Sequence, residues 1–115
     1  MSRDIIVQDI PIGVASIAEI PDMWTPAALP YTQADVVAAV IEIAPSTDIS
    51  DPQWLRVNLP GVSIEVNARD ESPLYSFALH IRGEDAPANV FVSRLLAKLG
   101  SRAFDVDSAS GLFEH

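Results

Sequence analysis

The fold is decided by residues 54–82, which read WLRVNLPGVSIEVNARDESPLYSFALHIR. Within this stretch, apolar and polar residues alternate in three runs, at 54–59, 62–67 and 75–82. Alternation is typical of strands that bury one face, because successive side chains point to opposite sides of a sheet. Pro60–Gly61 is a turn signal between the first two runs. We therefore expect a three-stranded antiparallel meander with one face exposed to water.

The alternation also divides the side chains of the meander between two faces. The mostly apolar set is expected to point toward covering helices, and the other set toward solvent. The set expected to be covered is Leu55, Val57, Leu59, Ile64, Val66, Tyr75, Phe77, Leu79 and Ile81. The opposite face would carry Trp54, Arg56, Asn58, Ser63, Glu65, Asn67, Ser76, His80 and Arg82.

Two helices are predicted, one before and one after the meander. Thr32 is a suitable N-cap for a helix at 33–44, which Pro45 ends. Asp85 is expected to cap the second helix and Gly100 to end it. Both segments place apolar residues at helical spacing, which predicts that each helix covers the sheet with one side.

Strands at both ends of the chain complete the predicted sheet. Short β-branched runs predict strands at 4–9 and 102–106, and Leu112–Phe113 is expected to pair back on the last one. We expect a single α+β domain over residues 1–115, with a mainly antiparallel sheet and two helices packed on one face. The predicted order is β-α-β-β-β-α-β, as in a ferredoxin-like relative with one extra strand.

Residues 21–31 form an irregular, proline-rich arm between the first strand and the first helix. Met23 and Trp24 are its large apolar side chains. One interpretation is an arm laid over the core, with Trp24 holding it in place. The other is contact with a partner, because aromatic residues on loops often serve recognition. Both residues are therefore candidate arm contacts.

The composition excludes several functional classes. The 115 residues contain no Cys, which removes disulfides, thiolate nucleophiles and zinc knuckles. His80 and His115 are the only histidines, too few for a multi-histidine metal site. A net charge of −9 opposes binding to a nucleic-acid backbone. Neither a secretory signal nor an apolar run of membrane-spanning length is seen, so we expect a soluble cytoplasmic protein.

The charge is unevenly distributed along the chain. No Lys or Arg lies between Asp4 and Asp51, whereas six of the seven cations follow that segment. Solubility alone explains such an acidic segment. An acidic surface that attracts a basic protein partner explains it equally directly.

The polar face of the meander is the candidate functional surface. One interpretation is an ordinary solvated sheet face with weak cross-strand pairs. The other is a contact surface for a second copy of the chain or for another protein, because Trp and Arg are enriched in interface hot spots. The candidate contact residues are Trp54, Arg56, Asn58, Glu65, His80 and Arg82.

A small enzyme or ligand-binding site around Glu65, His80 and Arg82 is the alternative. Glu65 would orient His80 as a general base from a neighbouring strand. A nucleophile is missing from this pattern, because Ser63 and Ser76 lie in ordinary strand positions without an elbow motif. Neither a Gly-rich phosphate loop nor a metal-binding spacing is found, so we assign no catalytic residue, cofactor or metal ligand.

Segments in the second half of the chain resemble small bacterial single-domain proteins that have no assigned activity. These segments are SIEVN at 63–67, SFALHIRG at 76–83, RAFD at 102–105 and GLFE at 111–114. The resemblance implies a stand-alone domain similar to immunity-type or other small adaptor proteins that act by binding. It carries over no catalytic residue. We therefore expect an acidic, non-catalytic protein-binding domain.

Overall fold

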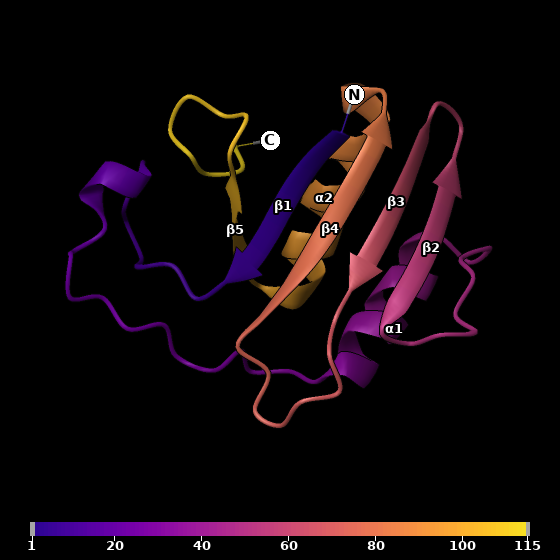
Figure 1. Ribbon diagram of the computed structural model, residues 1–115, viewed down its shortest axis with the longest axis horizontal. Helices are drawn as coiled ribbons and strands as arrows, with labels where there is room; N and C mark the ends of the chain where they lie inside the picture. The colour runs from indigo at the N-terminus through magenta and orange to yellow at the C-terminus, as the bar shows by residue number, and fades with distance from the viewer. Residues whose placement is uncertain (1, 115) are drawn as a thin grey trace.

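The computed structural model describes residues 2–114 and confirms the α+β class. Met1 and His115 lie outside the described residues, so the expectation for His115 is not assessed. Figure 1 shows one sheet with both helices behind it. The elements are β1 (Ser2–Gln8), the 3-10 turn η1 (Ile17–Glu19), α1 (Gln33–Ile43), β2 (Trp54–Leu59), β3 (Val62–Asn67), β4 (Ser76–Gly83), α2 (Asp85–Leu99) and β5 (Arg102–Asp105).

The five strands form one antiparallel sheet in the order β2-β3-β4-β1-β5. The meander pairs as predicted, with Leu55 opposite Val66 and Ile64 opposite Ile81. β1 lies between β4 and β5 and is antiparallel to both, so β4 and β5 run in the same direction and are joined by α2. A split β-α-β unit of this kind also occurs in ferredoxin-like folds.

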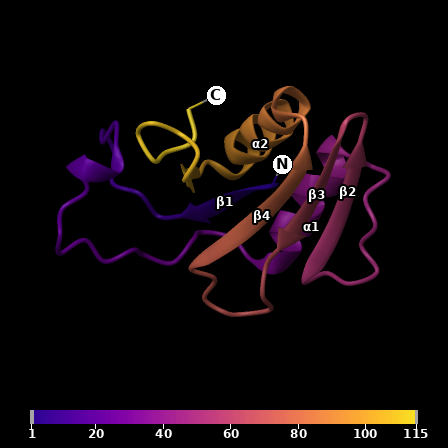
Figure 2. The ribbon, with the colours of Figure 1, turned by 45° about the horizontal axis from the view of Figure 1, so that its top comes forward.

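Both helices cover the same face of the sheet, and the other face has no covering element among the described residues (Figures 1 and 2). The molecule is only 19 Å thick along its shortest axis, as expected for two layers. The core fills the space between sheet and helices, where α1 buries Val36 and Val40 and α2 buries Phe91 and Leu95. We call the uncovered side of the sheet the open face.

The ends of the helices follow local sequence signals with one correction. Thr32 and Asp35 form a capping box, in which each side chain accepts a hydrogen bond from the backbone N–H of the other. Gly100 ends α2 in the left-handed conformation, with φ of 65°. The expectation that Asp85 caps α2 is wrong, because Glu84 occupies the N-cap and Asp85 is the first helical residue.

The division of side chains between two faces is confirmed for the strands, with an error where β4 begins. Tyr75, expected to be covered, is 49% exposed, because β4 starts only at Ser76. Leu74 enters the core instead, and its carbonyl oxygen accepts a hydrogen bond from the Leu29 N–H at 2.8 Å. Val62, absent from the expected set, is buried.

The proline-rich arm does not lie over the core. It extends beyond the β5 side of the sheet (Figure 1), and Met23 is 91% exposed. The indole N–H of Trp24 donates to the Asp9 carbonyl oxygen at 3.3 Å, and the Asp9 carboxylate accepts from the Ala27 N–H at 2.8 Å. Asp9 thus holds the middle of the arm, whereas Leu29, the one buried residue among 21–31, packs into the core.

Candidate functional site

The strand register places four charged or titratable side chains in one row across the open face. Arg56 of β2 lies opposite Glu65 of β3, Glu65 lies opposite His80 of β4, and His80 lies opposite Asp4 of β1. Neighbouring strands are about 4.8 Å apart, so these side chains lie next to one another on the same face. We call Arg56, Glu65, His80 and Asp4 the charged row.

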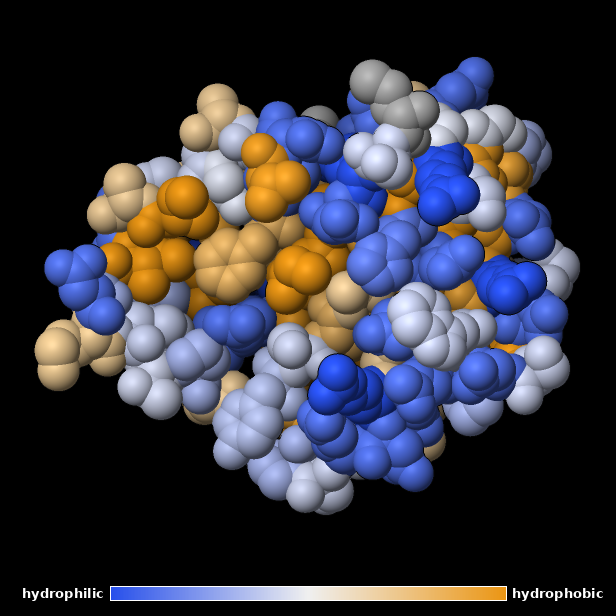
Figure 3. All heavy atoms as spheres, viewed as in Figure 1, coloured by the Kyte–Doolittle hydropathy of each residue, from blue (hydrophilic) through white to orange (hydrophobic). Residues whose placement is uncertain are grey.

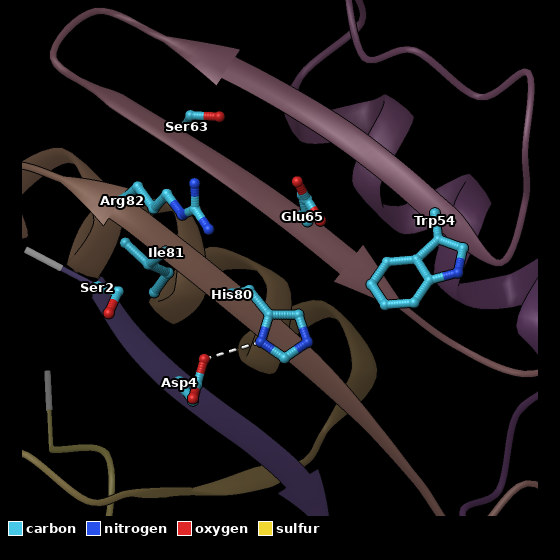
Figure 4. A pocket seen from close by; sticks show the side chains of 8 residues that line it. All are labelled: Ser2, Asp4, Trp54, Ser63, Glu65, His80, Ile81 and Arg82. Atoms are coloured by element: carbon cyan, nitrogen blue, oxygen red, sulfur yellow. Dashed lines mark hydrogen bonds and ion pairs between the residues drawn. The ribbon is translucent and has the colours of Figure 1, made fainter.

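The His80 ring is held from both sides. Its Nδ1 atom lies 2.8 Å from a carboxylate oxygen of Asp4, and its ring stacks on Trp54 with centroids 6.1 Å apart at 26°. Figure 4 shows the imidazole between these two side chains. The sequence predicts Glu65 as the group that orients His80. Glu65 is its strand neighbour, but the hydrogen bond that the structure shows goes to Asp4.

A shallow depression of about 350 Å³ lies over this part of the open face (Figure 4). The His80 side chain is 40% exposed there, and the Asp4 side chain is more exposed still. Acid–base catalysis benefits from a site that excludes water, which an exposed strand face does not provide. The depression is lined by Ser2, Asp4, Trp54, Ser63, Glu65, His80, Ile81 and Arg82.

Four of the six predicted contact residues line the depression, namely Trp54, Glu65, His80 and Arg82. Arg56 and Asn58 are exposed on β2, where Arg56 belongs to the charged row and Asn58 pairs with Ser63. The sequence analysis did not anticipate that β1 contributes Asp4 and Ser2. Nothing local in the first strand signals that it lies beside β4.

Backbone contacts with the preceding loop cover part of the sheet edge along β2. Asp48 and Arg56 exchange two backbone hydrogen bonds of 3.0 and 3.1 Å, and the Asp51 carbonyl oxygen accepts from the Trp54 N–H at 3.0 Å. Hydrogen bonds from the backbone and side chain of Ser50 lower the pKa of Asp48 below its ordinary value, and the charge of Arg56 adds to this. Asp48 therefore adds a negative charge at this edge.

The edge along β5 is covered. Phe104 forms a bridge with Leu112, as the predicted pairing of Leu112–Phe113 required. The Asp105 N–H donates to the Gly111 carbonyl oxygen at 2.8 Å, and the Phe113 N–H donates to the Ala103 carbonyl oxygen at 3.0 Å. Free strand edges are where another chain pairs most readily. The β5 edge is thus covered, whereas the structure shows partners along the β2 edge for Trp54 and Arg56 but not for Asn58, so the open face is the uncovered surface of the sheet with the most side chains available for contacts.

The open face has an apolar side next to the charged row. In Figure 3, apolar side chains gather over β1, β5 and the adjoining loops, whereas hydrophilic ones cover the β2–β4 side. The register sets Ala78 of β4, Ile6 of β1 and Phe104 of β5 side by side, all partly exposed. The same row begins at Trp54 and Asn67 on β2 and β3. We call these five residues, four of them apolar and one the polar Asn67, the apolar row.

A second polar cluster lies on the covered side of the sheet. Arg3 of β1 is only 9% exposed, and its guanidinium forms an ion pair with the buried Asp105 of β5 at 2.5 Å. A further guanidinium N–H donates to the side-chain oxygen of Asn89 on α2 at 2.7 Å, and Asp85 lies at 3.4 Å. The hydrogen bond with Asp105 is the main cause that raises the pKa of Arg3. This cluster ties both strands to α2.

The sequence did not predict the pairing of Arg3 with Asp105, although it carried a signal that Arg3 is buried. Arg3 precedes Ile5 and Val7 at a spacing of two residues, and the burial of β1 follows that spacing. The guanidinium also lies 5.8 Å from the ring centroid of Phe113. Asp105 and Phe113 fall in the RAFD and GLFE segments, so the structure gives these segments a role in holding the fold together.

Several acids of the segment between Asp4 and Asp51 have local partners in the structure. Asp35 caps α1, Glu42 forms an ion pair of 2.6 Å with Lys98 of α2, and Glu19 accepts a hydrogen bond from the Ala15 N–H. These contacts explain part of the acidic composition by local structure.

No family model, no curated protein and no solved structure matches the chain. The resemblance to small bacterial single-domain proteins therefore stays a prediction. Within residues 2–114, no cluster of three or more His, Asp or Glu is placed to hold a metal ion. Among the same residues, none of the helices has the length and apolar character needed to span a membrane.

Proposed function

We propose that the chain is a non-catalytic, cytoplasmic protein-binding domain of the immunity, inhibitor or adaptor type. The observation that carries this proposal is the open face, which is five strands wide and has no covering element among residues 2–114. Trp54 is 41% exposed on it, beside the charged row. Exposed Trp and Arg side chains on one surface are typical of interface hot spots.

Two surfaces support two kinds of contact. The open face, with Trp54 and Arg56 as anchors, is the surface proposed for self-association into a homodimer. The arm is the surface proposed for a basic protein partner, because Met23 and Trp24 are exposed there beside Asp22 and no Lys or Arg lies between residues 4 and 51. An acidic surface accelerates the encounter with a basic partner and disfavours nucleic acid.

Affinity capture from the native host at two salt concentrations tests the arm. The wild type is compared with the Met23→Ser/Trp24→Ser variant and with Val90→Ser, which removes an exposed apolar side chain from α2. We expect the wild type and Val90→Ser to retain the same basic protein at about 50 mM salt and to release it at about 500 mM, because salt screens exposed charges.

The arm variant is expected to lose that protein at both salt concentrations. Failure to enrich any basic protein at low salt would contradict the proposal. Equal retention by the wild type and the arm variant would contradict the role of Met23 and Trp24.

A ligand-binding or enzymatic site around Glu65, His80 and Arg82 is a second candidate. The observation in its favour is the Asp4–His80 hydrogen bond, which fixes the ring in the depression. NMR titration with phosphate and with acetate tests it, using Arg82→Gln as the comparison. Saturable shifts at His80 that Arg82→Gln abolishes would support this candidate, whereas unchanged spectra at about 10 mM ligand would remove it.

A further inference from the structure

The charged row is complementary to itself when its order is reversed. From β2 to β1 it reads Arg56, Glu65, His80 and Asp4, so cationic or protonatable groups alternate with carboxylates. If one row is laid against a reversed copy, Arg56 meets Asp4 and Glu65 meets His80. Each of these contacts occurs twice, and none brings like charges together.

We infer that a second copy of the chain covers the open face, related to the first by a two-fold axis that runs parallel to the strands between β3 and β4. This inference rests on the proposed role of the open face as a contact surface. Such an axis reverses the order of strands across the interface, so β2 faces β1 of the second copy and β3 faces β4. It also keeps the strands of both sheets aligned, as in face-to-face sheet packing.

The apolar row agrees with the same rotation. Trp54 of one copy then faces Ile6 of the other, and Asn67 faces Ala78, because these positions lie on β2–β1 and β3–β4 respectively. The exposed indole would therefore bury its surface against an apolar side chain. Two rows with different chemistry thus select one arrangement.

A two-fold axis that runs along the charged row is disfavoured. Such an axis would place each strand opposite the same strand of the second copy, so Arg56 would face Arg56 and Glu65 would face Glu65. Like charges that face each other directly destabilise an interface. The order of charges in the row therefore favours an axis parallel to the strands, and it favours a second copy of the chain as the partner that covers the open face.

The size of the open face sets the strength of this dimer. Strands of six to eight residues, spaced about 4.8 Å apart, give a face on the order of 500 Å² per copy. About 1,000 Å² in total is at the lower limit of specific interfaces. We therefore expect a weak dimer, with a Kd on the order of 10–100 μM.

Charge-swapped variants test the pairing of Arg56 with Asp4. The variants Arg56→Glu and Asp4→Arg are measured separately and as an equimolar mixture by sedimentation and light scattering, from about 5 to 500 μM. Each variant alone would bring like charges together at two contacts, so we expect dimerisation at least about tenfold weaker than that of the wild type.

The mixture is expected to restore a dimer close to wild-type affinity. In a mixed dimer, one contact joins the two substituted side chains, whose opposite charges are exchanged relative to the wild type. The second contact is the native Arg56–Asp4 pair. Rescue within one chain is excluded, because β3 and β4 separate Arg56 from Asp4.

Two further variants complete the design. Arg94→Glu makes the same charge change on α2, on the covered side of the molecule, and is expected to dimerise like the wild type. Trp54→Ala keeps the charged row and is expected to weaken the dimer at least about tenfold. It remains informative if a charge-swapped variant fails to fold, which circular dichroism checks first.

A wild-type chain that stays monomeric at about 500 μM would overturn this inference. So would a dimer that neither charge swap weakens, or swaps that weaken it without rescue in the mixture. These results leave the proposed function standing if the arm still captures a basic partner. If no basic protein is captured but the dimer forms and the mixture of charge-swapped variants restores it, only the proposal of a basic protein partner would be overturned.

Discussion

Arg3 of β1 joins the sheet to α2 and to the carboxyl-terminal segment. Its guanidinium contacts Asp105 and Asn89 and lies over the ring of Phe113. Bringing two charges out of water is costly, and the attraction between them offsets that cost only while both partners are present. Removal of one partner leaves the other buried and uncompensated.

Asp105→Asn is therefore expected to lower the free energy of unfolding by about 3–5 kcal/mol, because it leaves the Arg3 charge buried without its partner. Arg69→Gln is the matched control, because its ion pair with Glu71 is exposed and 3.5 Å long. That substitution should cost less than about 1 kcal/mol. Urea unfolding monitored by tryptophan fluorescence measures both, and equal losses would contradict the structural role of the buried pair.

At the residue scale, the sequence predicted which side chains of the meander are buried but not how the polar ones pair. Leu55 and Leu79 are assigned correctly because alternation within a strand is a local property. Asp4 meets His80, and Arg3 meets Asp105, only because β1 lies between β4 and β5. Pairs that join distant parts of the chain leave no spacing that a single sequence can reveal.

At the scale of the elements, the contact between the end of β4 and the β2–β3 turn is the most constrained. Gly83 ends β4 with φ of +122°, and a β-carbon placed on it would collide with the Gly61 carbonyl oxygen. Gly13, which precedes the arm, also has a positive φ, of +87°, but a β-carbon there would contact nothing within 4 Å. Substitution of Gly13 therefore tests the strain of a positive φ alone, whereas substitution of Gly83 tests such strain together with a collision.

Gly13→Ala is expected to cost about 1–2 kcal/mol, the typical strain of a side chain at positive φ. Gly83→Ala adds the collision with Gly61 and should cost clearly more, because the backbone of the β2–β3 turn must move. Thermal unfolding of the two variants side by side measures the difference. Equal transition temperatures would mean that the turn adjusts without cost.

Two helix boundaries lie where a local signal marks them. The capping box at Thr32 and the glycine at Gly100 lie where the predicted helix ends require. The prediction failed at Asp85, because the preceding residue, Glu84, adopts the extended N-cap conformation and the Asp85 carboxylate lies near Arg3. The prediction that Tyr75 is buried also failed, because the hydrogen bond between Leu29 and Leu74 sets Leu74 into the core in its place.

At the scale of the whole molecule, stability is unevenly distributed between the sheet and the arm. The strands β1 and β4 lie in the middle of the sheet, whereas Leu29 is the one fully buried residue of the arm. Segments with few buried contacts open at low free-energy cost. The backbone amides of Asp22, Met23, Thr25 and Ala28 should therefore exchange with solvent on the order of a thousandfold faster than those of β1 and β4.

Hydrogen exchange followed by NMR measures this difference residue by residue. Ala27 and Ile17 serve as internal controls, because their N–H groups donate to Asp9 and Ser110 and should exchange more slowly than their neighbours. Protection of the Met23 amide as strong as that of β4 would contradict this account of the arm.

The backbone contacts along both edges of the sheet also bear on how this chain could misassemble. Growth into a fibril requires an exposed row of backbone donors and acceptors that can template an incoming strand. Here the Asp48–Arg56 exchange and the Gly111–Asp105 bond would have to break before an incoming strand could pair along the whole of β2 or β5. Slow conversion to fibrils would thus be governed by transient breaking of these two backbone contacts. Conditions that weaken either contact should shorten the lag time of fibril formation.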